Sequence, residues 1–342
     1  MSGTLLRLMC TTAMATGAIL APTPSAAAPE PAERPVAELL RDLQRLHRDA
    51  ERATERYNAT AEKLRTRRAE AARINGSLAR AQSSLHHSRA AAGRLARQQY
   101  QGANDLSPYV RLLLSDDPQR ALEQGRLIRQ LAQDRAETLH RLTQDERTAR
   151  HLAARARTAL NSQLALAERQ ERDRDTVRER VRRAEELFAS LSARQRTAVA
   201  ETERRQVAGA QRKVMASGVL PGPRTPSAAG ARAVRYALAQ LGKPYVWGAV
   251  GPGGFDCSGL TSRAWAAAGR PIPRTSQAQW AGLRHVPLSQ LRPGDLVLYF
   301  PDATHVALYI GEGQVVQAPR TGSTVQVTPL AANPVLGAVR PQ

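Results

Sequence analysis

A heptad pattern of apolar residues near the N-terminus constrains the fold of this chain more than any other feature. Small or apolar residues recur at alternating steps of four and three, with arginine and glutamate between them. The pattern follows Leu39, Leu43, Leu46, Ala50, Ala53, Tyr57, Thr60 and Leu64 and, after a break at Arg67, Ala71, Ile74, Leu78, Ala81 and Leu85. Such a repeat is typical of a coiled coil. At about 1.5 Å per residue, about sixty helical residues make a rod of roughly 90 Å.

The heptad region is interrupted between residues 101 and 118. Gly102, Pro108 and Pro118 break helices there, and an apolar patch from Tyr109 to Leu114 lies between the prolines. From about Gln119 a second stretch is again rich in alanine, leucine, arginine and glutamate. We therefore expect residues 36–216 to form a long α-helical coiled-coil hairpin with a small apolar elbow near its tip.

The first residues have the pattern of an export signal. Arg7 is the only charged residue before Glu30, and a stretch of mostly apolar or small residues is followed by Ala26, Ala27 and Ala28. We interpret residues 1–28 as a signal peptide that is removed from a secreted, cell-wall protein. A membrane anchor is the weaker alternative, because the apolar run is short. Export would leave Cys257 as the single cysteine of the mature chain.

The charge of the chain is strongly basic. There are 50 Lys+Arg residues against 30 Asp+Glu, a formal net charge of +20. The charges are interspersed, no aromatic residues alternate with them, and an exported protein rarely meets nucleic acid. We therefore exclude a nucleic-acid partner and favour a solvated coiled-coil surface. Attraction to anionic wall polymers or to a membrane surface is the alternative.

The composition changes again after the helical region. Residues 217–229 (SGVLPGPRTPSAA) contain three prolines and two glycines and predict a linker. All three tryptophans fall in residues 230–342, so this segment can build a core of its own. The pattern predicts a helix over 231–241 and strands over 296–300, 306–310 and 315–318. Helices followed by strands indicate an α+β domain with a small antiparallel sheet.

Cys257 is the candidate nucleophile of this domain. Glycines precede it, Asp256 is a good N-cap, and the apolar pattern from Leu260 to Ala268 predicts a helix. The thiol would then lie in the first helical turn, where free N–H groups and the helix dipole lower the pKa of a cysteine below about 8.5. A buried, inert cysteine is the alternative.

A nucleophilic thiol needs a base, and the domain contains two histidines. His305 opens an alternating stretch that predicts a strand, whereas His285 lies in a polar stretch, so we favour His305. Gln317 follows after a predicted turn and can accept a hydrogen bond from the imidazole, which would fix its tautomer. Spacing alone fits a plain surface amide at Gln317 equally well.

Five ordered motifs in this domain resemble those of the NlpC-type cysteine peptidases of bacterial cell walls. They are Pro244–Gly248 (PYVWG), Asp256–Leu260 (DCSGL), Arg274–Gln277 (RTSQ), Leu291–Leu296 (LRPGDL) and His305–Gly311 (HVALYIG). The resemblance implies a papain-like core and hydrolysis of peptidoglycan stem peptides, usually between D-glutamate and a diamino acid. It implies Cys257 as nucleophile, His305 as base and Gln317 at the third polar position, which is often histidine in the family.

The resemblance also suggests substrate-binding residues. Tyr245 would lie beside the thiol, Asp256 and Ser258 would hold the stem peptide, and Arg274 and Ser276 would line the cleft. Core packing is the alternative for Tyr245, helix capping for Asp256, and a structural loop for Arg274 and Ser276. No cofactor is expected, and no cluster has the spacing of metal ligands.

Similar actinobacterial enzymes carry a long N-terminal coiled coil that can dock on a membrane division complex or block the catalytic cleft. We take both as hypotheses for this chain. The expected activity is a thiolate acyl-enzyme endopeptidase. A cell-wall amidase or acyltransferase with the same Cys–His pair, and a non-catalytic wall-binding scaffold, are the alternatives.

Overall fold

The computed structural model describes residues 34–101, 110, 118–220, 222 and 224–341. Residues Val36–Gln342 form one unit. The expected signal peptide, residues 1–28, lies outside the described residues. The helices are α1 (Val36–Gln101), α3 (Pro118–Ser190), α4 (Ala193–Ala216), α5 (Ala228–Leu238), α6 (Cys257–Ala267) and α7 (Ser276–Gly282). The strands are β1 (Arg284–Val286), β2 (Leu296–Tyr299), β3 (His305–Gly311), β4 (Gln314–Gln317), β5 (Gln326–Pro329) and β6 (Val335–Arg340).

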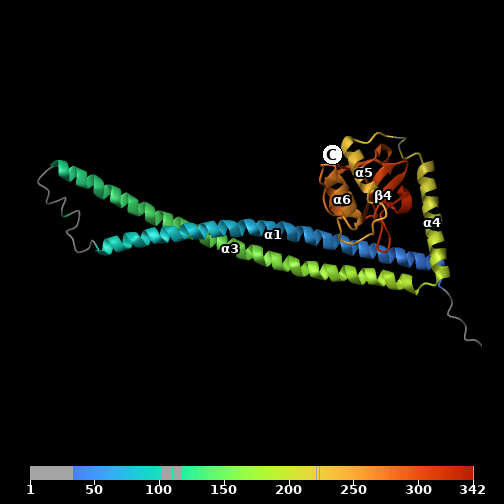
Figure 1. Cartoon of the computed structure of the whole chain (residues 1–342), viewed down its shortest axis with the longest axis horizontal. Coiled ribbons are helices and arrows are strands. Elements are labelled where there is room, and N and C mark those ends of the chain that lie inside the picture. Colours follow the sequence, from blue (N-terminus) through green and yellow to red (C-terminus); the bar gives the residue numbers. More distant parts are fainter. Residues whose placement is uncertain (1–33, 102–109, 111–117, 221, 223, 342) are drawn as a thin grey trace, which may run out of the picture. The chain divides into compact units, whose positions relative to one another are not determined.

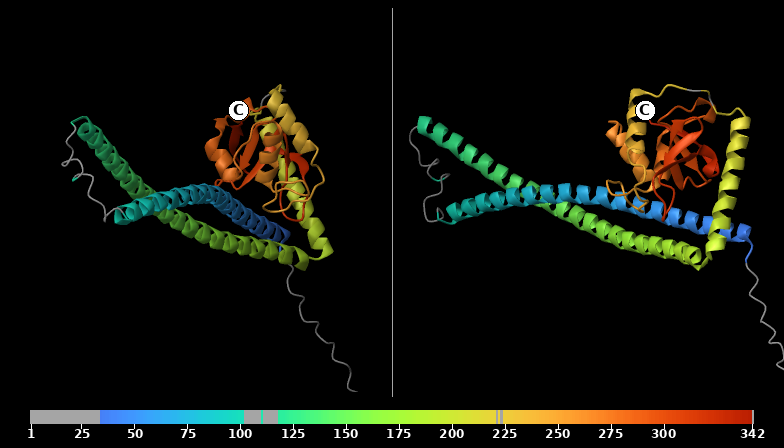
Figure 2. Two further views of the ribbon diagram at one scale, coloured as in Figure 1. Left: turned by 60° about the vertical axis from the view of Figure 1, so that its left-hand side comes forward. Right: turned by 45° about the vertical axis from the view of Figure 1, so that its right-hand side comes forward.

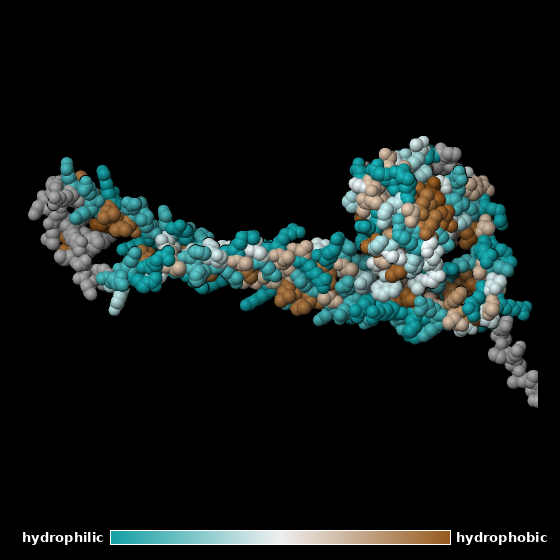
Figure 3. All heavy atoms as spheres, viewed as in Figure 1, coloured by the Kyte–Doolittle hydropathy of each residue, from teal (hydrophilic) through white to brown (hydrophobic). Residues whose placement is uncertain are grey.

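The two longest helices, α1 and α3, lie side by side and run in opposite directions (Figures 1 and 2). Thr60 donates to Asp173 at 2.7 Å, and Ser88, further along α1, donates to Asp145, which lies earlier in α3. On the face shown in Figure 3, the outer surface of these two helices is mostly hydrophilic, with scattered apolar patches. The predicted helical hairpin is therefore present, while its supercoiling stays a prediction. The apolar elbow falls mainly on residues 102–109 and 111–117, outside the described residues.

The second helical stretch does not continue to residue 216 as expected. It ends at Ser190, and α4 starts after Ser192, whose side chain accepts from the N–H of Gln195 in a complete capping box. Leu191 and Val199 then pack on the start of α1 in a small cluster with Leu39, Leu40 and Leu43. The Ser-x-x-Gln signal was present in the sequence, but the uniform composition on both sides of it hid the boundary.

Helix α4 lies against the C-terminal domain. The Gln211 side chain donates to the backbone oxygen of Gly313 at 3.0 Å and accepts from the N–H of Ala331 at 3.1 Å. Val214 packs against the apolar residues on one face of the sheet. No helix among the described residues is both long enough and apolar enough to cross a membrane.

The C-terminal domain contains a six-stranded antiparallel sheet in the order β1-β6-β2-β3-β4-β5. The three predicted strands correspond to β2, β3 and β4, and the predicted helices to α5 and α6. The α+β fold with an antiparallel sheet is thus confirmed. The sequence analysis missed α7, β1, β5 and β6, which are short or lie next to proline and glycine, where periodicity is weak.

The central strands β2 and β3 bury side chains on both faces of the sheet, since successive side chains point to opposite faces. Leu296, Leu298, Val306 and Leu308 point toward α5 and α6, where Trp265 completes the cluster. Their neighbours along the strands, which include Val297, Tyr299, Ala307 and Tyr309, form the second cluster on the opposite face. The packing fixes α6 and β3 against each other, and these two elements carry the candidate nucleophile and base.

Candidate active site

Cys257 is the first residue of α6, and Asp256 is its N-cap. The Asp256 carboxylate accepts from the N–H of Gly259 at 2.6 Å, which fixes the helix start. Added bulk at Gly259 would collide with the backbone oxygen of Ala249, so the glycine permits the close loop contact behind the nucleophile. The thiol is buried at 3% exposure and makes no disulfide.

His305 opens β3 and is fully buried. The ring lies close enough to the Cys257 thiol for each group to shift the pKa of the other. On its other side, Nε2 lies 2.5 Å from Oε1 of Gln317, and the Gln317 amide nitrogen donates to Thr328 at 2.6 Å. Since the amide nitrogen is engaged by Thr328, Oε1 accepts from the ring N–H. This leaves Nδ1 as the basic nitrogen.

The second histidine of the domain is not part of this arrangement. His285 lies in β1 and is exposed. Its ring packs on Trp280 with a centroid distance of 3.9 Å, and its Nε2 donates to the Trp280 backbone oxygen at 2.9 Å. The structure therefore brings His305, and not His285, to Cys257.

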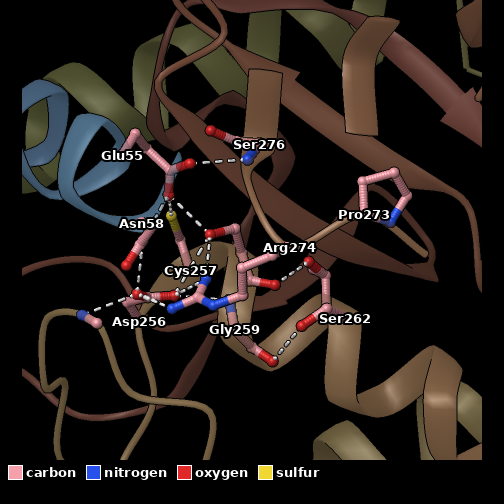
Figure 4. Close-up of polar contacts among 12 residues, drawn as sticks. Glu55, Asn58, Asp256, Cys257, Gly259, Ser262, Pro273, Arg274 and Ser276 are labelled. Atoms are coloured by element: carbon pink, nitrogen blue, oxygen red, sulfur yellow. Dashed lines mark hydrogen bonds and ion pairs between the residues drawn. The ribbon is translucent and has the colours of Figure 1, made fainter. Parts of the chain in front are cut away.

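The predicted binding residues Asp256, Arg274 and Ser276 lie together beside the thiol (Figure 4), and Ser258 follows Cys257 directly in α6. Arg274 makes a two-point contact with Asp256, at 2.6 Å to one carboxylate oxygen and 3.0 Å to the other. It also donates to the Ser258 hydroxyl at 2.8 Å. Asp256 thus caps a helix and holds an arginine at once. The fully buried Asp256 needs the largely buried Arg274, because an unpaired buried charge would be strongly destabilising.

Helix α1 inserts a carboxylate into this cluster, which the sequence analysis did not anticipate. Glu55 accepts from the Ser258 hydroxyl at 2.7 Å and from the N–H of Ser276, the first residue of α7, at 2.9 Å. Its oxygen lies 4.0 Å from the Cys257 sulfur. Figure 4 shows Glu55 pointing from α1 toward the thiol. Asn58, one turn further, donates to Asp256 at 3.1 Å.

A second carboxylate of α1 reaches the base. Glu51 Oε1 lies 3.1 Å from Nδ1 of His305, the nitrogen that would serve Cys257. Nearby, the Tyr57 ring meets the Trp247 ring edge to face at 5.4 Å. Tyr57 was expected on the seam between the long helices, but it contacts the C-terminal domain instead. The α1 segment therefore contacts the candidate nucleophile, base and binding cluster together.

The pKa of the Cys257 thiol is raised, whereas the sequence analysis expected it to be lowered. Burial raises the pKa of Cys257 from 9.0 to about 11, and the charges of Glu55 and Asp256 add to the effect, although His305 opposes it. Burial and the nearby Asp256 likewise raise the pKa of Glu55 to about 7. Burial lowers the pKa of His305, but Glu51 and Cys257 outweigh it and raise that pKa well above 6.5. With α1 in place, burial outweighs the effect that the helix N-terminus was expected to have on the thiol pKa.

Tyr245 is buried beside the thiol, with 7% exposure, and packs in the apolar core that includes Cys257. Both alternatives considered for it, core packing and a place at the thiol, thus hold together. Among the described residues, no group of three or more histidine, cysteine or acidic side chains is arranged to hold a metal ion.

Sequence reasoning missed Glu51, Glu55 and Asn58. It assigned the charges of the rod to a solvated surface, and these three lie one or two positions away from the heptad seam. They follow each other at steps of four and three, which places them on one helix face. That stripe was the available signal, but a polar stripe on a helix indicates burial only when the partner surface is known.

Comparisons with known proteins agree with the motifs. Residues 242–337 match the NlpC/P60 family. Over 108 residues the chain is 44% identical to a probable endopeptidase of Mycobacterium tuberculosis, covering 31% of this chain and 28% of that protein. It is 39% identical over 137 residues to the peptidoglycan endopeptidase RipA of Mycolicibacterium smegmatis, covering 33% and 28%. The chain thus spans about a third or less of the length of these two relatives.

One similar solved structure is the NlpC/p60 domain of the peptidoglycan hydrolase SagA. It is 35% identical and covers 32% of this chain and 97% of that one, with a TM-score of 0.31. The C-terminal domain of this chain is an NlpC/P60 domain, as the sequence motifs predicted.

Proposed function

Given an NlpC/P60 domain at residues 242–337, we propose that the chain is a secreted cysteine endopeptidase that cleaves peptidoglycan stem peptides at the D-glutamyl–diamino acid bond. The observation that carries the proposal is His305, held by Gln317 through a hydrogen bond and electrostatically coupled to Cys257, beside the Asp256–Arg274 pair. Two relatives are named as endopeptidases, one of them for peptidoglycan. Metal ligands are not required for this chemistry.

The geometry assigns a role to each group. Cys257 attacks the scissile carbonyl as a thiolate after its proton passes to Nδ1 of His305. The imidazolium then protonates the leaving amine, and the acyl-enzyme forms. In the second half, the same ring takes a proton from water, which hydrolyses the thioester. N–H groups at the start of α6 would stabilise the oxyanion, while Gln317 keeps the ring oriented.

We further propose that α1 holds this enzyme in a closed state. Glu55 occupies the space next to the sulfur and consumes the polar groups of Ser258 and Ser276. Glu51 faces the nitrogen that must act as base. The inhibition is thus both steric and chemical, because the same contacts bury the thiol and raise its pKa.

The deciding experiment is digestion of purified peptidoglycan, followed by mass analysis of the fragments. The native chain is compared with a variant that carries Glu51→Ala and Glu55→Ala, so that inhibition does not hide the activity. Fragments cut between D-glutamate and the diamino acid support the proposal. Release of whole stem peptides from the sugar would identify an amidase, a transferred acyl group an acyltransferase, and an undigested wall to which the protein is bound a scaffold.

The release of α1 needs a trigger. Docking of the long helices on a membrane division complex remains a hypothesis for that trigger, motivated by helices much longer than a spacer requires. It predicts that membrane fractions of the source cell, added to the native chain, raise hydrolysis and leave the Glu51→Ala, Glu55→Ala variant unchanged. No stimulation of the native chain would count against it.

A further inference from the structure

Three side chains of helix α1, at a regular spacing of four residues, lie along the candidate active site. Glu55, Glu51 and His47 are spaced four residues apart, which places each about 6 Å from the next along one helix face. Glu55 meets Ser258 and Ser276, and Glu51 meets His305. The third position, His47, lines two cavities together with Arg320. The base therefore lies between the Asp256–Arg274 cluster on one side and Arg320 on the other.

Arg320 is held close to the catalytic series. It follows Gln317, the last residue of β4, by three positions, in a turn where its N–H donates to the Ser323 hydroxyl at 3.1 Å. It lines a cavity of about 810 Å³ that also borders Gln317 and Glu51. A second cavity joins it to Tyr245, which lies beside the thiol.

The counter-ion of Arg320 comes from outside the peptidase domain. Its two terminal nitrogens donate to the two carboxylate oxygens of Glu203 in α4, at 2.8 and 3.0 Å. Arg274, by contrast, is neutralised by Asp256 within the domain itself. Among the described residues, no acidic side chain of the peptidase domain pairs with Arg320. If α4 moves away, Arg320 keeps its place in the turn and presents an unpaired guanidinium to the cleft.

The chemistry of the reaction decides which part of a substrate meets this group. His305 must protonate the leaving nitrogen, so the leaving half of the substrate lies on the His305 side of Cys257, toward Gln317 and Arg320. A guanidinium that can bind through two nitrogens matches a carboxylate. Resting on the proposed function, we propose that Arg320 binds a carboxylate on the leaving half of the stem peptide. Glu203 occupies that position in the closed state.

The test uses the full chain with Glu51→Ala, Glu55→Ala and Glu203→Gln, here called the opened chain. Two peptides are compared, L-Ala-γ-D-Glu-diaminopimelate and the same peptide with both diaminopimelate carboxylates amidated. Binding is measured by calorimetry in the opened chain with Cys257→Ala, and hydrolysis by mass spectrometry with Cys257 intact. Arg320→Gln removes the charge, Arg320→Lys keeps it without the two-point geometry, and Arg263→Gln, on the exposed face of α6, is the matched control.

We expect the opened chain to prefer the free carboxylates about tenfold. Arg320→Gln removes this preference by weakening only the acidic peptide, Arg320→Lys retains part of it, and Arg263→Gln retains all of it. A loss of equal size for both peptides, or an unchanged preference, overturns the proposal while cleavage by the opened chain upholds the proposed function. If the opened chain neither binds nor cleaves either peptide, both fail.

Discussion

Residues 51–58 and residues 71–85 belong to the same helix, α1, but they bury different kinds of side chain. The later segment buries Ala71, Ile74 and Leu85, as expected of a helix packed on α3. The earlier one buries Glu51, Glu55 and Asn58. Burying an apolar side chain stabilises the fold against any apolar surface. Burying a carboxylate costs several kcal/mol unless specific hydrogen-bond donors contact it. Only the peptidase domain supplies such donors, so the polar segment is matched to one partner surface.

The largest expected effect comes from removing the nucleophile, which tests catalysis independently of the contact between α1 and the peptidase domain. Cys257→Ala lowers hydrolysis of purified peptidoglycan at least about 10³-fold, because alanine has no thiol to form the acyl-enzyme. It is measured in the background with Glu51→Ala and Glu55→Ala, where the site is open. Ser262→Ala, on the same helix, serves as the control and stays within about twofold. Hydrolysis that persists in the Cys257→Ala chain would refute thiol catalysis.

The next largest effect comes from removing the two buried carboxylates of the polar segment. Glu51→Ala with Glu55→Ala raises hydrolysis about tenfold to a hundredfold over the native chain, since Ser258, Ser276 and His305 become free for substrate. Initial rates on soluble muropeptides are compared. Glu70→Ala is the matched control, because this glutamate pairs only with Arg67 on the exposed part of α1 and should change nothing. An unchanged rate in the double variant would show that α1 does not inhibit.

A smaller effect comes from pH. The pKa of Glu55 is about 7 while α1 is docked on the peptidase domain, and it returns to its ordinary 4.5 when Glu55 is exposed to water. The docked state therefore binds the proton more tightly, so its advantage is full below pH 4.5 and is lost as the pH rises to about 7. His305, whose pKa is also raised by Glu51, changes in the same direction at higher pH.

The measurement is the ratio of the rates of the native chain and Glu55→Gln, which cannot titrate at this position. We expect this ratio to rise about tenfold between pH 5 and pH 7, after discounting the full shift for relaxation of the site. Dividing by the variant removes the titration of the catalytic pair, which both chains share. A ratio that is flat across this range contradicts the role given to Glu55.

The smallest effect belongs to an exposed contact of the same segment. Arg52 donates to Asp302 of the peptidase domain at 2.5 Å, but both side chains are largely open to water. Exposed ion pairs contribute about 0–1 kcal/mol. Arg52→Ala should thus raise basal hydrolysis by less than about threefold, and 0.5 M salt should erase the difference. An increase as large as that of the double glutamate variant would mean that exposed charge, rather than the buried carboxylates, holds α1 in place.

Much of the peptidase domain follows from local sequence. Asp256 before Cys257 and a helical apolar pattern after it place the thiol at a helix start, because capping and periodicity act over a few residues. The alternation from His305 onward places the base on a strand for the same reason. The heptad seam likewise predicts long helices. Local sequence patterns did not predict short elements such as β1 and α7. Their residues are held by neighbours in the sheet and loops rather than by local preference.

The +20 charge, the heptad seam and the five motifs are properties of the sequence by itself, and they determined a helical hairpin joined to a candidate thiol peptidase. Only the tertiary structure decided that Glu51 and Glu55 face the Cys257–His305 pair and that Glu203 pairs with Arg320. The reason is that about 200 residues separate Glu55 from Ser258. A glutamate on a helix has the same local pattern whether water or an active site lies opposite.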